Sequence, residues 1–203
     1  MAAVFLLTGP PGVGKTTLIR QLLRRLDVPA GGFFTAEIRE GRQRVGFAIE
    51  DLAGRRGVLA RALGEGDRHA AGNPTAGPRV GRYRVDMAAL DEVGVAAIER
   101  AMSGDRRARL LVIDEIGKME ACSARFRAAV EQALETPGLV IVGTILQASH
   151  PWVDRVKAHP AVTLMRLTAA SREAVLADLT ERVRAALALG TSDEVEGRRC
   201  STG

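Results

Sequence analysis

One segment of eight residues constrains the fold of this chain more than any other. It reads Gly-Pro-Pro-Gly-Val-Gly-Lys-Thr from Gly9 to Thr16 and matches the pattern G-x-x-x-x-G-K-[ST] at every fixed position. The apolar run Ala3 to Thr8 before it is typical of a buried strand, and Leu18, Leu22 and Leu26 after it have helical spacing. The segment is therefore expected to join a strand to a helix in an α/β fold.

The loop has the composition of a phosphate-binding site. Its glycines let backbone N–H groups point inward, and the positive end of the following helix dipole lies beside them. We expect Lys15 to bridge the β- and γ-phosphates of a nucleoside triphosphate, Thr16 to offer its hydroxyl to Mg²⁺, and Thr17 to reach the α-phosphate region. The predicted nucleotide-binding residues here are Gly9, Pro10, Pro11, Gly12, Val13, Gly14, Lys15, Thr16 and Thr17.

Two acidic residues follow the apolar run Leu110 to Ile113, which has the pattern of a central parallel strand. Ligands of α/β sheets collect at the carboxyl ends of the strands. We expect Asp114 to hold Mg²⁺ mostly through water, and Glu115 to activate the attacking water as a general base. This arrangement implies hydrolysis. The alternative is that both acids only cap the next loop.

The same loop contains Lys118, one of only three lysines in the chain. We hypothesise that Lys118 neutralises negative charge that develops at the γ-phosphate, and so acts with Lys15 and Glu115 in catalysis. The alternative is a solvent-facing lysine or a salt bridge to Glu120. The predicted nucleotide-binding residues of this second block are Val112, Ile113, Asp114, Glu115, Ile116, Gly117, Lys118 and Met119.

The remaining chain alternates strand and helix patterns, which predicts a three-layer α/β sheet. Residues 31–61 indicate antiparallel strands inserted after the first helix, and residues 63–80 indicate a long loop. Residues 1–190 are expected to form a single domain, and residues 191–203 a disordered tail. The expected strands are 33–39, 44–51, 57–61, 81–85, 110–113, 139–145 and 162–167, and the expected helices are 16–26, 88–102, 122–134 and about 168–189.

Several polar residues at other strand positions are weaker candidates. Thr35, Glu37 and Arg39 alternate along a predicted strand and share one face, so they could approach the γ-phosphate or Mg²⁺, or face solvent. Thr144 closes another predicted strand and is placed like a γ-phosphate sensor, or like an ordinary strand-end hydroxyl.

Composition excludes several classes of protein. Of the 203 residues 46% are apolar and 26% charged, the balance of a soluble globular protein, and no apolar run is long enough to span a bilayer. The first residues lack the basic flank and cleavage site of a secretion signal. We therefore expect a cytoplasmic monomer with no membrane partner. Cys122 and Cys200 are too few for a disulfide framework or a metal site.

The chain is basic, with a net charge of +5 and a pI near 10.0, which favours contact with anions. Its arginines are nevertheless interleaved with acidic residues and form no single tract. Nucleic acid is therefore a possible partner that the sequence does not establish.

Taken together, several blocks resemble the small nucleoside-triphosphatases of the thermophile-type or cancer-related kind, from about Val4 to about Leu187. The resemblance implies a RecA-like P-loop core and slow Mg²⁺-dependent hydrolysis of ATP, GTP, CTP and UTP to diphosphates, with little base selectivity. One departure is Ala36, where the family pattern leads us to expect a second acidic residue beside Glu37. The matching blocks are Gly9 to Thr17, Gly32 to Arg39, Arg44 to Phe47, Gly81 to Asp86 and Val112 to Glu120.

Two other functions use the same features. A P-loop kinase would transfer the phosphoryl group to a small acceptor, with Gly64 to Arg84 as a lid. A nucleotide-gated, nucleic-acid-associated switch would use hydrolysis as a timer, and the basic composition favours it.

Overall fold

The computed structural model describes residues 1–64, 77–103 and 109–199. Most of the predicted elements are present, with ends that differ by a few residues. The elements in chain order are β1 (Ala3–Thr8), α1 (Lys15–Leu26), β2 (Ala30–Glu40), β3 (Gln43–Asp51), β4 (Arg56–Ala62), β5 (Arg79–Val80), β6 (Tyr83–Val85), α2 (Met87–Ala89), η2 (Leu90–Val95), α3 (Ala96–Met102), β7 (Leu110–Ile116), η3 (Glu120–Cys122), α4 (Ala124–Glu135), β8 (Val140–Ile145), α5 (Pro151–Lys157), β9 (Val162–Arg166) and α6 (Arg172–Arg199).

The described strands form one nine-stranded sheet in the order β5-β6-β4-β3-β2-β7-β8-β1-β9. In this order the neighbours from β2 through β7, β8 and β1 to β9 pair in parallel. The neighbours on the other side, from β2 through β3, β4 and β6 to β5, pair antiparallel. The predicted antiparallel insertion after the first helix is thus confirmed, and it extends one edge of the parallel sheet. Strand β8 lies between β1 and β7, so the glycine-rich loop and Asp114 come from strands that are separated by a single strand.

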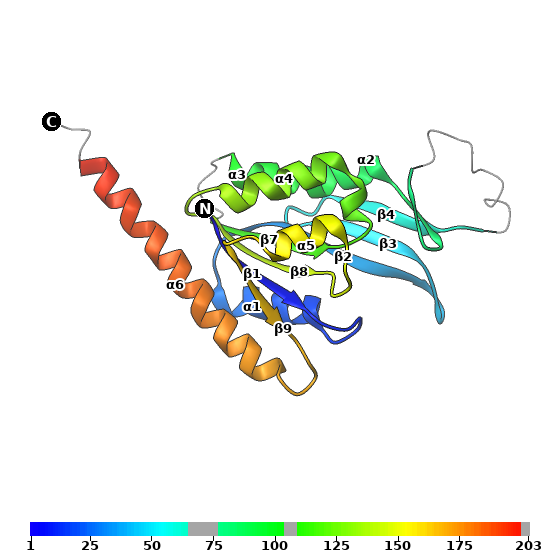
Figure 1. Cartoon of the computed structure of the whole chain (residues 1–203), viewed down its shortest axis with the longest axis horizontal. Helices are drawn as coiled ribbons and strands as arrows, with labels where there is room; N and C mark the ends of the chain where they lie inside the picture. The colour runs from blue at the N-terminus through cyan, green and yellow to red at the C-terminus, as the bar shows by residue number, and fades with distance from the viewer. Residues whose placement is uncertain (65–76, 104–108, 200–203) are drawn as a thin grey trace.

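Helices cover both faces of the parallel strands, which confirms the three-layer arrangement (Figure 1). Helices α1 and α6 pack on one face, around Leu18, Leu22 and Leu179, which are fully buried. The other face is covered by η2, α3, α4 and α5, and its core includes Phe126, which makes edge contacts with Phe33 and Trp152 at 6.1 Å between ring centroids. Each face therefore has its own hydrophobic core, and the sheet separates the two.

Three helices differ from the prediction. The helix expected at 88–102 is divided by a π-helical stretch, η2. In η2, Gly94 lies so close to β3 that a Cβ atom on it would stand 3.0 Å from the Cδ1 atom of Ile49. Helix α5 was missed, although His150, which caps it, and Pro151 in its first turn are local signals of a helix start. Helix α6 continues to Arg199, past the predicted end near residue 189 and into the predicted tail.

Residues 65–76 of the loop predicted at 63–80 lie outside the described residues. The last two residues of that predicted loop, Arg79 and Val80, form the short strand β5. In the described part of the chain no helix is both long and apolar enough to cross a membrane.

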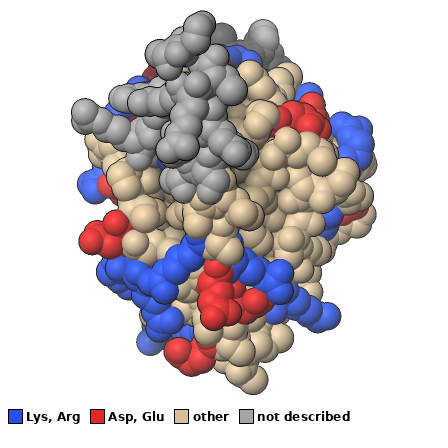
Figure 2. All heavy atoms as spheres, turned by 90° about the vertical axis from the view of Figure 1, so that its left-hand side faces the viewer, with Lys and Arg blue, Asp and Glu red and all other residues tan. Residues whose placement is uncertain are grey.

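Charged side chains of both signs lie next to one another on the face shown in Figure 2. On α6, Arg182 donates to Asp178 at 2.7 Å, and Arg184 donates to the carbonyl of Arg25 on α1 at 3.1 Å. The described part of this face therefore carries mixed charge, as the interleaved sequence predicts.

The inserted strands share the core of the parallel sheet, so we expect them to unfold with it. Leu59 on β4 is 1% exposed within the same core as Phe126, whereas Leu52 is 39% exposed. Leu59→Ala should destabilise the protein by about 2–5 kcal/mol, and Leu52→Ala by far less. Urea denaturation would measure both. A separate early transition in Leu59→Ala would contradict a single domain.

Candidate functional site

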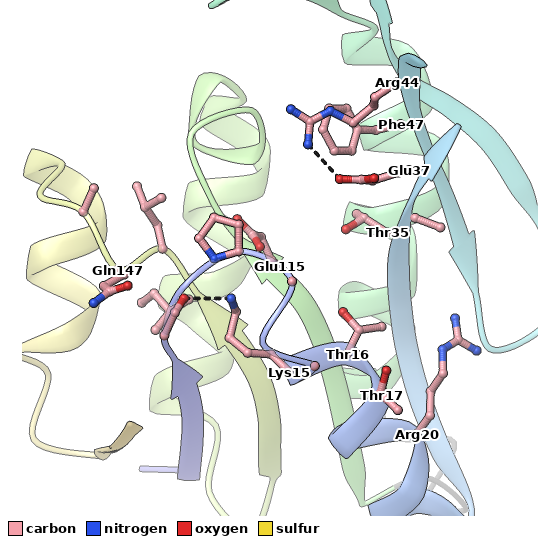
Figure 3. Close-up of a pocket in the computed structure, with 18 residues that line it drawn as sticks. Lys15, Thr16, Thr17, Arg20, Thr35, Glu37, Arg44, Phe47, Glu115 and Gln147 are labelled. Carbon is pink, nitrogen blue, oxygen red and sulfur yellow. Dashed lines mark hydrogen bonds and ion pairs between the residues drawn. The ribbon is translucent and has the colours of Figure 1, made fainter. Parts of the chain in front are cut away.

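A pocket of about 820 Å³ opens where the carboxyl ends of β1, β7 and β8 meet the inserted strands. Its floor is the glycine-rich loop and the start of α1, with Lys15 and Thr16. One wall is formed by β2 and β3, and the opposite wall by the residues after β8, including Gln147 (Figure 3). The structure thus brings the predicted loop and Glu115 into one cavity.

The loop has a backbone that suits its glycines. Gly12 and Gly14 have φ values of 75° and 96°, which favour residues without a Cβ atom. The ammonium of Lys15 donates to the carbonyls of Gly9 at 2.9 Å and Pro10 at 3.2 Å, so this cation lies within the loop. The N-terminus of α1 points into the same space, as expected for a phosphate-binding loop.

Arg172, at the start of α6, is a contact that the sequence analysis did not identify. Its Nη2 donates to the carbonyl of Val13 at 2.7 Å, and a Cβ atom on Gly14 would lie 2.4 Å from this nitrogen. The Nε of Arg172 is buried without a hydrogen-bond partner. Arg172 therefore fixes the last turn of the loop from a residue 159 positions away.

Asp114 lies behind the pocket floor and is 2% exposed. The hydroxyl of Thr144 on β8 donates to Oδ1 of Asp114 at 2.5 Å. This hydrogen bond holds the carboxylate of Asp114 in place. Burial raises the pKa of Asp114, while the hydrogen bond from Thr144, the nearby Thr16 hydroxyl and the charge of Lys15 oppose the shift. Burial is the larger effect, so the pKa of Asp114 stays above its ordinary value, and the opposing groups only reduce the shift.

The residues near Asp114 fit a divalent cation held mainly by phosphates and water. The Oδ2 of Asp114 is buried and has no hydrogen-bond partner, and the Thr16 hydroxyl is its neighbour. Hard oxygen ligands of this kind suit Mg²⁺, which keeps several waters and takes one or two carboxylates. In the described residues no group of three or more His, Cys, Asp or Glu gathers into a metal cluster.

Glu115 follows Asp114 and lines the pocket with a partly exposed side chain. Burial raises its pKa, the charge of Asp114 raises it further, and the charge of Lys15 lowers it. A carboxyl with a raised pKa holds a proton more tightly than an ordinary surface glutamate, which favours a role as a general base.

Glu120 is a third carboxyl in this region, and its burial was not predicted. It is 4% exposed, and its Oε2 and the Oε1 of Glu115 lie 2.8 Å and 2.7 Å from the point where a Cβ atom of Gly117 would stand. Burial and the charge of Glu115 raise the pKa of Glu120 to about 8. Gly117 therefore leaves the space that both carboxyl groups use.

The inserted strands supply pocket residues that the sequence analysis treated as weak candidates or missed. Thr35 and Glu37 line the wall, whereas Arg39 binds Glu37 from outside the pocket. Arg44 and Phe47 on β3 complete this wall and were not predicted. Ala36, the departure from the family pattern, lines the pocket too.

Some predicted nucleotide-binding residues lie away from the pocket lining. Val112, Ile113 and Ile116 are buried in the cores, so they support the strand. The side chain of Lys118 is exposed and does not line the pocket, and in the described structure it forms no ion pair with Glu120. A role for Lys118 in catalysis stays a prediction.

The raised pKa of Glu120 predicts a pH-dependent stability. Its ordinary value is 4.5, so between about pH 4.5 and about pH 8 the unfolded chain releases a proton that the folded chain keeps. The free energy of unfolding should therefore fall as the pH rises through this range. Glu120→Gln, which cannot ionise, should be the more stable protein near pH 8. Thermal unfolding of both proteins across this range would test this, and parallel curves would contradict it.

Comparisons with known proteins agree with this geometry. The model of the family described as NTPase matches residues 4–180. The chain is 41% identical over 174 residues to nucleoside-triphosphatase THEP1 of Thermotoga maritima, which covers 86% of this chain and 91% of that protein. It is 39% identical over 194 residues to the human cancer-related nucleoside-triphosphatase, and the match covers 91% of this chain and 98% of the human protein.

Solved structures give the same result. The crystal structure of THEP1 from Aquifex aeolicus superimposes with a TM-score of 0.73 at 34% identity, over 87% of this chain and 96% of that one. The solution structure of the human protein has the same TM-score at 37% identity, with 91% and 98% covered. The fold is therefore the P-loop NTPase fold, and the chain belongs to the NTPase family that these proteins represent.

Proposed function

We propose that the protein hydrolyses nucleoside triphosphates to diphosphates and inorganic phosphate in a Mg²⁺-dependent reaction. The observation that carries the proposal is the position of Glu115, which lines the pocket above the loop that holds Lys15. A carboxylate beside a phosphate-binding loop can take a proton from an attacking water. The relatives from Thermotoga maritima and human are named nucleoside-triphosphatases, which supports hydrolysis of this class of compound.

The chain's own residues divide the work of this reaction. The backbone of the loop and Lys15 hold the β- and γ-phosphates and offset the charge that develops between them. Glu115 accepts the proton of the water that attacks the γ-phosphorus. Asp114 and Thr16 would hold Mg²⁺, which when bound neutralises phosphate charge. Thr144 keeps Asp114 in position for this role.

Low base selectivity follows from the kind of contacts proposed. Backbone N–H groups and Lys15 recognise phosphates, which are the same in every nucleotide. We therefore propose that the protein hydrolyses ATP, GTP, CTP and UTP with similar kcat/KM. The sequence-based expectations of a monomer in the cytoplasm stay part of the proposal.

The alternative of a nucleic-acid-associated switch has less support. The face shown in Figure 2 carries acidic groups among its basic ones, and nucleic-acid sites usually present a continuous positive surface. A kinase remains compatible with the pocket, because transfer to an acceptor needs the same triphosphate site.

Two substitutions separate chemistry from binding. Glu115→Gln should keep triphosphate and Mg²⁺ binding but lower kcat by roughly 10²-fold or more, because the amide cannot accept the proton.

Lys15→Ala should weaken triphosphate affinity and abolish turnover, because it deletes the charge that spans the two phosphates. Phosphate release from each of the four triphosphates, with and without Mg²⁺, measures both effects. Wild-type turnover in a folded Lys15→Ala protein would refute the proposal.

Gly117 offers a test of the base geometry. A Cβ atom there would lie within 2.8 Å of oxygens of Glu115 and Glu120, closer than van der Waals contact allows. Gly117→Ala should therefore displace Glu115 and lower kcat by about tenfold or more, with a smaller change in KM. Gly41→Ala controls for backbone strain alone, because Gly41 has a φ of 59°, which disfavours a Cβ atom, while nothing lies within 4 Å of that atom. Equal kcat in both variants would argue against Glu115 as the base.

A further inference from the structure

We propose that the pocket contains a second subsite, for an uncharged hydroxyl compound of nucleoside size that accepts the γ-phosphoryl group. We define this acceptor subsite by Thr35, Glu37, Arg44, Phe47 and Gln147, all of which line the pocket. The inference rests on the proposed function, because the acceptor would receive phosphate from the same bound triphosphate.

The acceptor subsite lies on the side from which a nucleophile must approach. Phosphoryl transfer is roughly in line, so the attacking oxygen stands opposite the bond that breaks. Lys15 marks the γ-phosphate position, and Glu115 stands beside it. In Figure 3 Glu37, Arg44 and Phe47 lie beyond Glu115, at the end of the pocket away from α1. A molecule seated there would present its hydroxyl to Glu115.

The wall of this subsite is held in place before any ligand binds. Arg44 donates through Nη1 to Glu37 at 2.7 Å and through Nε to the hydroxyl of Tyr83 at 2.7 Å. Its guanidinium carbon lies 5.0 Å from the ring centroid of Phe47, and Phe47 makes an edge contact with Tyr83 at 5.1 Å. A planar guanidinium fixed on an aromatic ring offers a flat surface on which another ring can stack.

The charges of the subsite favour an uncharged ligand. Arg44 lowers the pKa of Glu37, so this carboxylate stays ionised and neutralises the guanidinium that it binds. An anionic acceptor would also meet the repulsion of Glu115. The remaining polar groups, the Thr35 hydroxyl and the Gln147 amide, suit hydroxyl groups, while Leu146 and Ala148 add apolar surface. Ring compounds with free hydroxyls, such as nucleosides, combine these properties.

The transfer itself uses the groups that serve hydrolysis. The acceptor oxygen forms a bond to the γ-phosphorus, and the bond from that phosphorus to the bridging oxygen breaks. The hydroxyl proton passes to Glu115, and the nucleoside diphosphate leaves with the bonding electron pair. The products are a phosphomonoester and a diphosphate. Water and the acceptor hydroxyl therefore compete for the same place beside Glu115, from which the attacking oxygen reaches the γ-phosphorus.

Product analysis with labelled ATP tests the inference. The protein would be incubated with Mg²⁺, ATP labelled at the γ-phosphate, and in turn adenosine, guanosine, cytidine, uridine, myo-inositol and pyridoxine. We expect at least one of them to divert label from inorganic phosphate into a phosphomonoester. Phe47→Ala should lower the labelled ester relative to phosphate by about tenfold, because the stacking surface is lost. Phe47→Tyr keeps the ring and should retain the transfer.

The outcomes separate this inference from the proposed function. Label found only as inorganic phosphate with all six compounds would overturn the acceptor subsite and leave hydrolysis intact. A rise in the KM for ATP in Phe47→Ala would also overturn it, because the wall would then bind the base of the triphosphate itself. Absence of both labelled products would instead refute the proposed hydrolysis.

Discussion

Parallel pairing of β1, β8 and β7 is the constraint on which the rest of the molecule depends. These strands are buried on both faces, so their side chains are almost only apolar except near their carboxyl ends. Polar groups can then appear at one edge of the sheet, and in parallel strands all carboxyl ends meet at the same edge. The glycine-rich loop, Thr144 and Asp114 converge for this reason.

Close packing at that edge has an electrostatic cost. Asp114, Glu115 and Glu120 lie in one partly dry region, and burial raises the pKa of all three. The hydrogen bond from Thr144, the nearby Thr16 hydroxyl and the charge of Lys15 reduce this cost at Asp114. Glu120 has no basic neighbour of this kind among the described residues, and a protonated carboxyl there avoids a third negative charge. The three carboxyl groups therefore have different protonation behaviour in one small volume.

The inserted antiparallel strands change what a P-loop core can do. Strands β2 and β3 form one wall of the pocket that contains the loop and Glu115. The far part of this wall is Arg44, which contacts Glu37, Tyr83 and Phe47. This wall belongs to the same hydrophobic core as the parallel strands, through residues such as Leu59 and Tyr83. Its position relative to Lys15 is therefore fixed by packing.

The sequence alone determined the parts whose cause is local. Residue order and periodicity over a few turns determine the loop from Gly9 to Thr16, its flanking strand and helix, and the acidic pair near the carboxyl end of β7. The antiparallel insertion was also visible, because hairpins join strands that are neighbours in sequence. Helix α5 was missed because it is short, although its local start signals were present.

Tertiary structure decided which distant residues meet. Arg44 reaches Tyr83 across 39 positions, and Arg172 reaches the loop across 159. Lys118 and Glu120 are two residues apart, yet one is exposed and the other buried, because η3 turns Glu120 inward behind Gly117. Periodicity reports which face of an element is apolar, but strand order and helix packing decide what that face contacts. The order of the sheet is therefore what turned scattered polar residues into a pocket.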